Sequence, residues 1–162
     1  MNPIATHQPI LIAAISETTG AILELGLGYS STVLIHTIAG DRLICSIDDN
    51  SEWVEKFRYL ESDTHQFGVF SEDVFEKIGK HFSVALINLS TWDQRMFSIE
   101  KLRYFVDYIV IHDAQDRGLS RLFKYWREYR TNDYPMPTTL LASNKLSLDD
   151  IRVEGATIVN HG

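Results

Sequence analysis

The sequence contains little cysteine and no long apolar run. Cys45 is the only cysteine among the 162 residues, which excludes an internal disulfide and a cysteine-based metal cluster. The apolar stretch PILIAAI, residues 9–15, is too short to cross a bilayer and follows no basic segment, so it predicts neither a membrane span nor a signal peptide. We therefore expect a cytoplasmic protein with a reduced Cys45 and no membrane association.

Basic residues are also scarce. The 15 Lys and Arg residues are outnumbered by 22 Asp and Glu residues, and the resulting net charge of -7 repels a phosphate backbone. This argues against non-specific nucleic-acid binding and favours a small-molecule or protein partner. Low-complexity segments, internal repeats and long flexible linkers are absent from the sequence. A chain of this length predicts one domain spanning residues 1–162.

Short apolar runs of strand type alternate with segments of helical period along the chain. The runs cover residues 21–25, 43–47, 67–70, 82–89, 107–111, 138–142 and 156–159. Helical segments are expected at 8–17, 30–39, 51–60, 92–105 and 119–130. The alternation predicts an α/β fold with a doubly wound, mostly parallel seven-stranded sheet and helices on both faces. The last two runs predict an antiparallel pair at its edge. Ligands of such sheets bind outside the carboxyl ends of the central strands.

The first predicted strand runs into two glycines in the string ILELGLGYSST, residues 22–32. Glycines let the backbone approach a ligand, and the N–H groups of the following helix start favour electron-rich groups. Ser31 stands where a dinucleotide-binding pattern has its third glycine, so a pyrophosphate site is disfavoured. A tight turn without a ligand is the alternative. Glu24 is costly inside a buried strand unless a partner group or a cation compensates its charge.

The second predicted strand ends in SIDDN, residues 46–50, about twenty residues beyond the glycine turn. A carboxylate at Asp48 could accept hydrogen bonds from both hydroxyls of a ribose. Asp49 and Asn50 lead into a helix, so an ordinary N-cap cluster is the alternative. We assign the ribose to Asp48 and the helix cap to Asn50 or Ser51.

Four strings in register, ILELGLGYSST, SIDDNSEWVEKF, VALINLS and DYIVIHDAQDR, resemble class I S-adenosylmethionine-dependent methyltransferases over about residues 4–160. The resemblance implies a Rossmann-like fold and S-adenosylmethionine as cofactor. It places Asp48 on the ribose, and Asp49 and Trp53 beside the adenine. It also implies that the segment 4–15 forms a helix that closes over the cofactor, with Thr6 and His7 at the rim. Around the methionine end it places Glu24, Gly26, Gly28, Tyr29 and Ser30.

The fourth and fifth strands carry the remaining candidates. Asn88 lies at the fourth strand end, where the family usually presents Asp, and is assigned to the cofactor site. The fifth strand ends in IHDAQDRG, where His112 and Asp113 could orient or deprotonate an acceptor hydroxyl or amine. A structural role is the alternative for His112. A Mg²⁺ site of Asn88, Asp113 and Asp116 resembles metal-dependent O-methyltransferases, but the neutral Asn weakens it, so we predict no metal.

These observations predict an S-adenosylmethionine-dependent methyltransferase that acts on an oxygen or nitrogen acceptor. The alternative is a catalytically silent binding or sensor module with the same fold, which Asn88 and the short chain favour. A chain of 162 residues leaves no room for a substrate lid, so the site should be shallow. We therefore expect a homo-oligomer, or an acceptor presented by a larger molecule.

Overall fold

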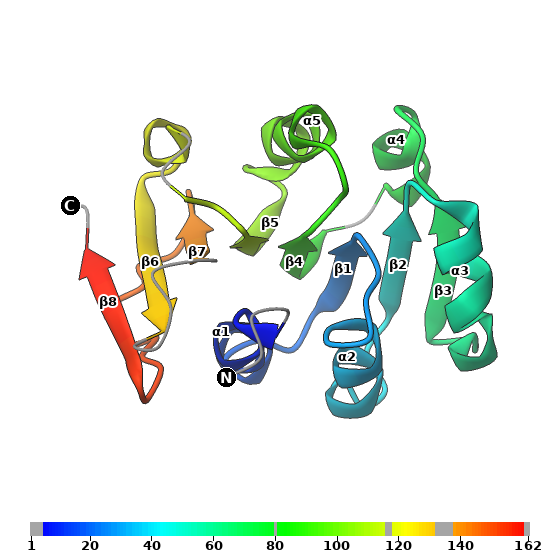
Figure 1. Cartoon of the computed structure of the whole chain (residues 1–162), viewed down its shortest axis with the longest axis horizontal. Helices are drawn as coiled ribbons and strands as arrows, with labels where there is room; N and C mark the ends of the chain where they lie inside the picture. The colour runs from blue at the N-terminus through cyan, green and yellow to red at the C-terminus, as the bar shows by residue number, and fades with distance from the viewer. Residues whose placement is uncertain (1–4, 80, 116–117, 132–137, 161–162) are drawn as a thin grey trace.

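The computed structural model describes residues 5–79, 81–115, 118–131 and 138–160, and these form one eight-stranded sheet (Figure 1). The strand order is β3-β2-β1-β4-β5-β7-β6-β8. The first five strands in this order run parallel to one another, and the last three strands, β7, β6 and β8, each run antiparallel to the neighbours with which they pair. The parallel strands are β1 (Ala21–Leu25), β2 (Ile44–Asp48), β3 (His65–Val69), β4 (Phe82–Ile87) and β5 (Val106–His112). The antiparallel strands are β6 (Tyr125–Thr131), β7 (Thr139–Ser143) and β8 (Ala156–Asn160).

Helices cover both faces of the sheet, as the alternating pattern predicts. One face carries α1 (Gln8–Ser16) and α2 (Thr32–Ile38), and the other carries α4 (Val74–Ile78) and α5 (Trp92–Leu102) (Figure 1). The helix α3 (Ser51–Phe57) packs beside β2 and β3 and continues into a 3₁₀ turn, η2 (Arg58–Leu60). Asn50 caps α3 by accepting a hydrogen bond from the Glu52 N–H at 2.9 Å, which confirms the predicted cap. None of the helices among the described residues has the length and apolar character needed to span a membrane.

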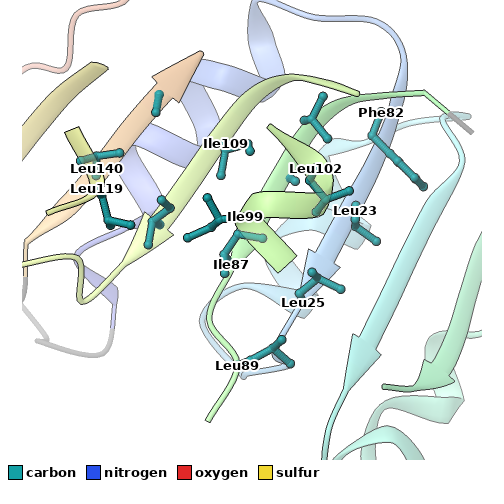
Figure 2. Close-up of a cluster of buried hydrophobic side chains, with 14 of the residues drawn as sticks. Leu23, Leu25, Phe82, Ile87, Leu89, Ile99, Leu102, Ile109, Leu119 and Leu140 are labelled. Atoms are coloured by element: carbon teal, nitrogen blue, oxygen red, sulfur yellow. The ribbon is translucent and has the colours of Figure 1, made fainter. Parts of the chain in front are cut away.

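The central strands are buried on both sides, and their side chains alternate between two apolar layers. Leu23 and Ile87 belong to the apolar layer on the α5 side, which also contains Ile99 and Leu102 of that helix (Figure 2). Ile22 points to the opposite face and packs in the layer that contains Ile35 of α2 and the apolar side of α1. The strand period also places Glu24 on this second face, beneath the start of α2.

Three predictions about the carboxyl-terminal part of the fold are wrong. The segment 119–130 is not a helix: a 3₁₀ turn, η3 (Leu119–Leu122), leads into strand β6. The aromatic side chains of this segment suit a strand, in which Tyr125 and Tyr129 face the α1 layer while Trp126 faces the α5 layer. The sheet therefore has eight strands rather than seven. The predicted pairing of the last two strands is also wrong, because β6 lies between β7 and β8.

Candidate functional site

The strand order reverses at β1, and α/β sheets generally place their ligands at such a switch point. From β1 the chain proceeds to β2 and β3 on one side and to β4 and β5 on the other. Crevices at such switch points open outside the carboxyl ends of the strands. The glycine turn, Asp48, Asn88 and His112 all lie at these ends.

The glycine turn is held against the end of β4. Gly26 has a φ of +95°, and a Cβ there would overlap the backbone carbonyl of Asn88, so both conformation and space require glycine. The Gly26 N–H donates to the Ile47 carbonyl at 2.8 Å, and the Asn88 N–H donates to the Leu25 carbonyl at 2.6 Å. The turn thus continues the hydrogen bonding of the sheet on both sides.

Asp48 joins the glycine turn to the start of α3. Its Oδ2 accepts a hydrogen bond from the Leu27 N–H at 2.6 Å, and its Oδ1 accepts one from the Asn50 N–H at 2.8 Å. Burial raises the pKa of this carboxyl group, while the two backbone donors oppose the rise. Each carboxylate oxygen keeps a second lone pair that could accept a hydroxyl. The structure therefore brings Asp48 and the turn together.

Glu24 lies beneath the turn and is fully buried. Its two carboxylate oxygens accept hydrogen bonds from the Thr32 hydroxyl at 3.0 Å and the Ser46 hydroxyl at 2.7 Å. Burial raises the pKa of Glu24 to about 7, although these hydroxyls favour the ionised form. Thr32 also accepts the Gly28 N–H at 3.0 Å, so the carboxyl group is linked to the turn through one side chain.

An aromatic cluster flanks the turn on the α3 side. The ring of Tyr29, which is 65% exposed, meets the rings of Trp53 and Phe57 edge-on at centroid distances of 5.6 and 5.3 Å. The Lys56 ammonium lies 4.1 Å from the centroid of Trp53. An exposed aromatic surface of this kind can stack against a flat ring.

Two contacts cross from the switch point to other segments. Asp49 accepts a hydrogen bond from the Ser90 hydroxyl at 2.9 Å, which links the ends of β2 and β4. The Gln8 amide donates to the Ser30 carbonyl at 2.7 Å, which fastens the start of α1 to the glycine turn. The predicted leading helix therefore lies beside the turn.

Arg95 of α5 organises the ends of β4 and β5, a role that sequence reasoning missed. Its guanidinium donates to the Leu89 carbonyl at 2.5 Å, to the His112 carbonyl at 2.7 Å and to the Asn88 Oδ1 at 3.3 Å. Asn88 thus contacts protein groups through its side chain. The sequence held no signal for this role, because an arginine in a helix usually reaches solvent.

His112 is buried at the end of β5 and contacts the leading segment. Its Nε2 lies 3.2 Å from the Thr6 hydroxyl, and its Nδ1 lies 3.2 Å from Asn88 Oδ1. The ring of His7 meets it edge-on with a centroid distance of 4.6 Å. Both ring nitrogens of His7 are buried without a hydrogen-bond partner among the described residues, and burial lowers the pKa of His7 to about 3.

Asp113 follows His112 and adopts a left-handed conformation, with a φ of +54°. Its Oδ2 lies 3.9 Å from His112 Nδ1, and its side chain is partly exposed. Asp113 lines a cavity of about 200 Å³ together with Ser90, Trp92 and Arg95.

The metal site considered from the sequence includes Asp116, which lies outside the described residues. Within the described ranges, no group of three or more His, Cys, Asp or Glu side chains is arranged to hold a metal ion.

No protein-family model and no curated protein matches the sequence. Solved structures do resemble it. An O-methyltransferase from Bacillus cereus in complex with S-adenosylhomocysteine aligns with a TM-score of 0.62 and 12% identity over 88% of this chain and 81% of that one. The N-methyltransferase NodS from Bradyrhizobium japonicum, also in complex with S-adenosylhomocysteine, aligns with a TM-score of 0.59 and 14% identity. The alignment covers 84% of this chain and 83% of that one. An rRNA methylase from Streptococcus thermophilus aligns with a TM-score of 0.58 and 14% identity over 87% of this chain and 95% of that one. The chain therefore has the Rossmann-like α/β fold of class I S-adenosylmethionine-dependent methyltransferases.

Proposed function

We propose that this protein is an S-adenosylmethionine-dependent methyltransferase that acts on an oxygen or nitrogen acceptor. The observation that carries the proposal is the contact between Asp48 Oδ2 and the Leu27 N–H at 2.6 Å, which joins the glycine turn to an acidic strand end at the switch point. Two methyltransferases of the same fold hold S-adenosylhomocysteine, the product of that cofactor. The acceptor is a small molecule or a protein.

The residues at the switch point suit this cofactor. The space beside Gly28 is open, because a Cβ there would meet the Ser31 hydroxyl at 3.6 Å and no other described atom within 4 Å apart from its neighbours in the chain. Asp48 can accept hydroxyls, and the exposed ring of Tyr29, which meets Trp53 edge-on, can stack against a base. When bound, the cofactor supplies a methyl group on a positively charged sulfur.

The chain's own contribution to such a reaction is alignment and the exclusion of water. Asp48 would hold the ribose, and Asp49 and Trp53 would lie at the adenine side. Glu24 and the turn from Gly26 to Ser30 would surround the methionine end. His112 and Asp113 would orient the acceptor or take its proton, because both lie at the end of β5 and Asp113 borders a cavity.

A catalytically silent module is the second candidate, and Asn88 favours it. The Asn88 amide oxygen is engaged by Arg95 and lies 3.2 Å from His112, so the end of β4 offers no carboxylate to an acceptor. Such a module would retain the cofactor and bind a partner or report its concentration.

Calorimetric titration tests the proposal. The wild-type protein should bind S-adenosylmethionine and S-adenosylhomocysteine but not NAD. Asp48→Ala should weaken that binding at least about tenfold, because each hydrogen bond to a carboxylate contributes roughly 1.5 to 3 kcal/mol. Asp63→Ala removes the same charge from an exposed loop and should leave the affinity unchanged. Circular dichroism confirms that each variant is folded, and absence of binding by the wild type overturns the proposal.

Turnover separates the enzyme from the silent module. With a panel of hydroxyl and amine acceptors, His112→Ala and Asp113→Ala should lower methyl transfer more than cofactor affinity. Equal losses of rate and affinity would indicate structural roles for these two residues. Tight cofactor binding with no transfer to any acceptor would favour the module. Sedimentation of the protein tests the expected homo-oligomer.

A further inference from the structure

A row of hydrogen-bonded side chains leads from the buried carboxyl group of Glu24 to the surface. Ser46 of β2 lies between Glu24 and His65: its hydroxyl is 2.7 Å from Glu24 Oε2 and 2.9 Å from His65 Nε2. The other ring nitrogen of His65 lies 3.0 Å from Nδ1 of His36, a partly exposed residue of α2. Four consecutive groups therefore connect the interior beneath the glycine turn with solvent.

The branch through Thr32 can carry hydrogen bonds in one direction only. The Gly28 N–H can only donate, so the Thr32 hydroxyl accepts from it and gives its own hydrogen to Glu24 Oε1. The branch through Ser46 is different, because a hydroxyl and a neutral imidazole can each donate on one side and accept on the other. That branch is therefore reversible.

Two complete patterns satisfy the Ser46 branch. With Glu24 ionised, Ser46 donates to Glu24, His65 donates from Nε2 to Ser46, and His36 donates from Nδ1 to His65. With Glu24 protonated, every donor and acceptor in this row exchanges its role, and His65 carries its hydrogen on Nδ1 instead of Nε2. The two patterns differ by one proton on Glu24 and by the tautomers of two histidines.

The surroundings of Glu24 favour a change of charge near neutral pH. Burial raises its pKa to about 7, and the negative charge of Asp48 acts in the same direction, while hydrogen bonds from Ser31 and Thr32 oppose it. On the β4 side the paired residue is the apolar Leu86. Glu24 can thus gain or lose a proton within the physiological range.

The surroundings of His65 keep it uncharged in that range. Burial, with a smaller contribution from the neighbouring His36, lowers its pKa to about 4, although the carboxylate of Glu61 acts in the opposite direction. The His65 ring stacks on Phe67 at a centroid distance of 4.3 Å, which fixes its plane. A neutral imidazole can pass a proton across its ring without storing charge, because one nitrogen accepts a proton while the other releases one.

We propose that Ser46, His65 and His36 conduct a proton between Glu24 and solvent, and that binding of a positively charged ligand at the glycine turn expels this proton. On release, the O–H bond of Glu24 breaks and its proton passes to Ser46 Oγ, whose own proton passes to His65 Nε2. The Nδ1 proton of His65 then passes to His36 Nδ1, and His36 gives its Nε2 proton to water. One proton leaves Glu24, one reaches water, and every other group stays neutral.

This proposal deepens the proposed function, on which its ligand part rests. S-adenosylmethionine carries a sulfonium charge that S-adenosylhomocysteine lacks. An ionised Glu24 attracts that charge, and a protonated Glu24 does not. The preference for the methyl donor over its product should therefore increase several-fold as the pH rises from 6 to 8.

Nitrogen-15 NMR of the histidine rings tests the relay on the free protein. Between pH 6 and 9, His65 should stay neutral and move its hydrogen from Nδ1 to Nε2 with a midpoint near pH 7. Ser46→Ala interrupts the row and should abolish this exchange. Ser98→Ala, which removes a buried hydroxyl from α5, should retain it. A single His65 tautomer throughout, or protonation of both its nitrogens, overturns the relay.

The ligand part is tested separately at pH 7. Addition of S-adenosylmethionine should move His65 toward the Nε2–H tautomer, and S-adenosylhomocysteine should move it less. Equal shifts with both compounds, or binding without any shift, overturn the link between ligand and relay. If neither compound binds, the proposed function fails, whereas the pH-dependent tautomer exchange of the free protein still decides the relay.

Discussion

Replacement of Glu24 by glutamine should change how stability depends on pH. Burial raises the pKa of Glu24 from 4.5 to about 7, so the folded state holds its proton more tightly than the unfolded state does. The stabilisation from this proton is fully present below pH 4.5 and is lost as the pH rises through 7. At about 1.36 kcal/mol per pKa unit, the loss amounts to about 3 kcal/mol by pH 8. Glu24→Gln carries no such charge and should avoid that loss.

Urea unfolding followed by tryptophan fluorescence at several pH values between 4 and 8 measures the effect. The free energy of unfolding of Glu24→Gln should rise by about 3 kcal/mol relative to that of the wild type across this range. Contributions from His7 and His65 are common to both proteins and cancel in the difference. Glu72→Gln makes the same change at an exposed position and should run parallel to the wild type. A difference between Glu24→Gln and wild type that stays constant with pH would refute the reasoning.

Three further substitutions test the contacts around the strand ends. Gly26→Ala should lower the free energy of unfolding by at least about 2 kcal/mol, because the new Cβ overlaps backbone at the end of β4. Gly40→Ala, also at positive φ but with no heavy atom within 4 Å, should cost less in the same urea titration. Arg95→Met should lower the free energy of unfolding by about 2 to 4 kcal/mol, because two carbonyl groups lose the guanidinium that donates to them. The control Arg58→Met, at the surface, should lower it by under about 1 kcal/mol. Equal losses for the two variants in chemical denaturation would contradict this prediction. His7→Leu should unfold at a lower pH than the wild type. Because burial lowers the pKa of His7 to about 3, the wild type loses about 5 kcal/mol of stability as the pH falls from 6.5 toward 3, and the leucine variant does not. An acid-unfolding midpoint that is the same in both proteins, measured by circular dichroism, would contradict this prediction.

The parallel half of the sheet could be predicted because its signal is local and strong. Strands that are buried on both faces read as unbroken apolar runs, and the runs at 21–25 and 107–111 match β1 and β5 within a residue or two. The Asn50 cap could be predicted for the same reason, since a cap depends on its immediate neighbours. The glycine turn and Asp48 were expected to meet because parallel strands end at one edge.

The features that were missed depend on contacts distant in sequence. In β6, Trp126 and Tyr129 stand three residues apart in the sequence. This spacing places both residues on one face of a helix or on opposite faces of a strand, so the pattern fits either structure. The segment forms a strand because it pairs with β7, which is a contact that the local pattern does not indicate. Neither Arg95 nor the contact between His36 and His65 could be expected, because nothing near these residues in the sequence indicates what they touch. Predicted roles in binding stay predictions, since they concern ligands rather than the fold.

The order of the last strands has a consequence for how the protein is made on the ribosome. Strand β7 lies between β5 and β6, although it follows β6 in the chain. During synthesis, β6 emerges before the strand that would connect it to the sheet, and β5 is an open edge until Ser143 has left the exit tunnel. His112 pairs with Thr139 in that late strand. The nascent chain therefore completes the β5 side of the sheet after the side formed by β1, β2 and β3, and a stalled ribosome would expose an unpaired β5 to neighbouring chains.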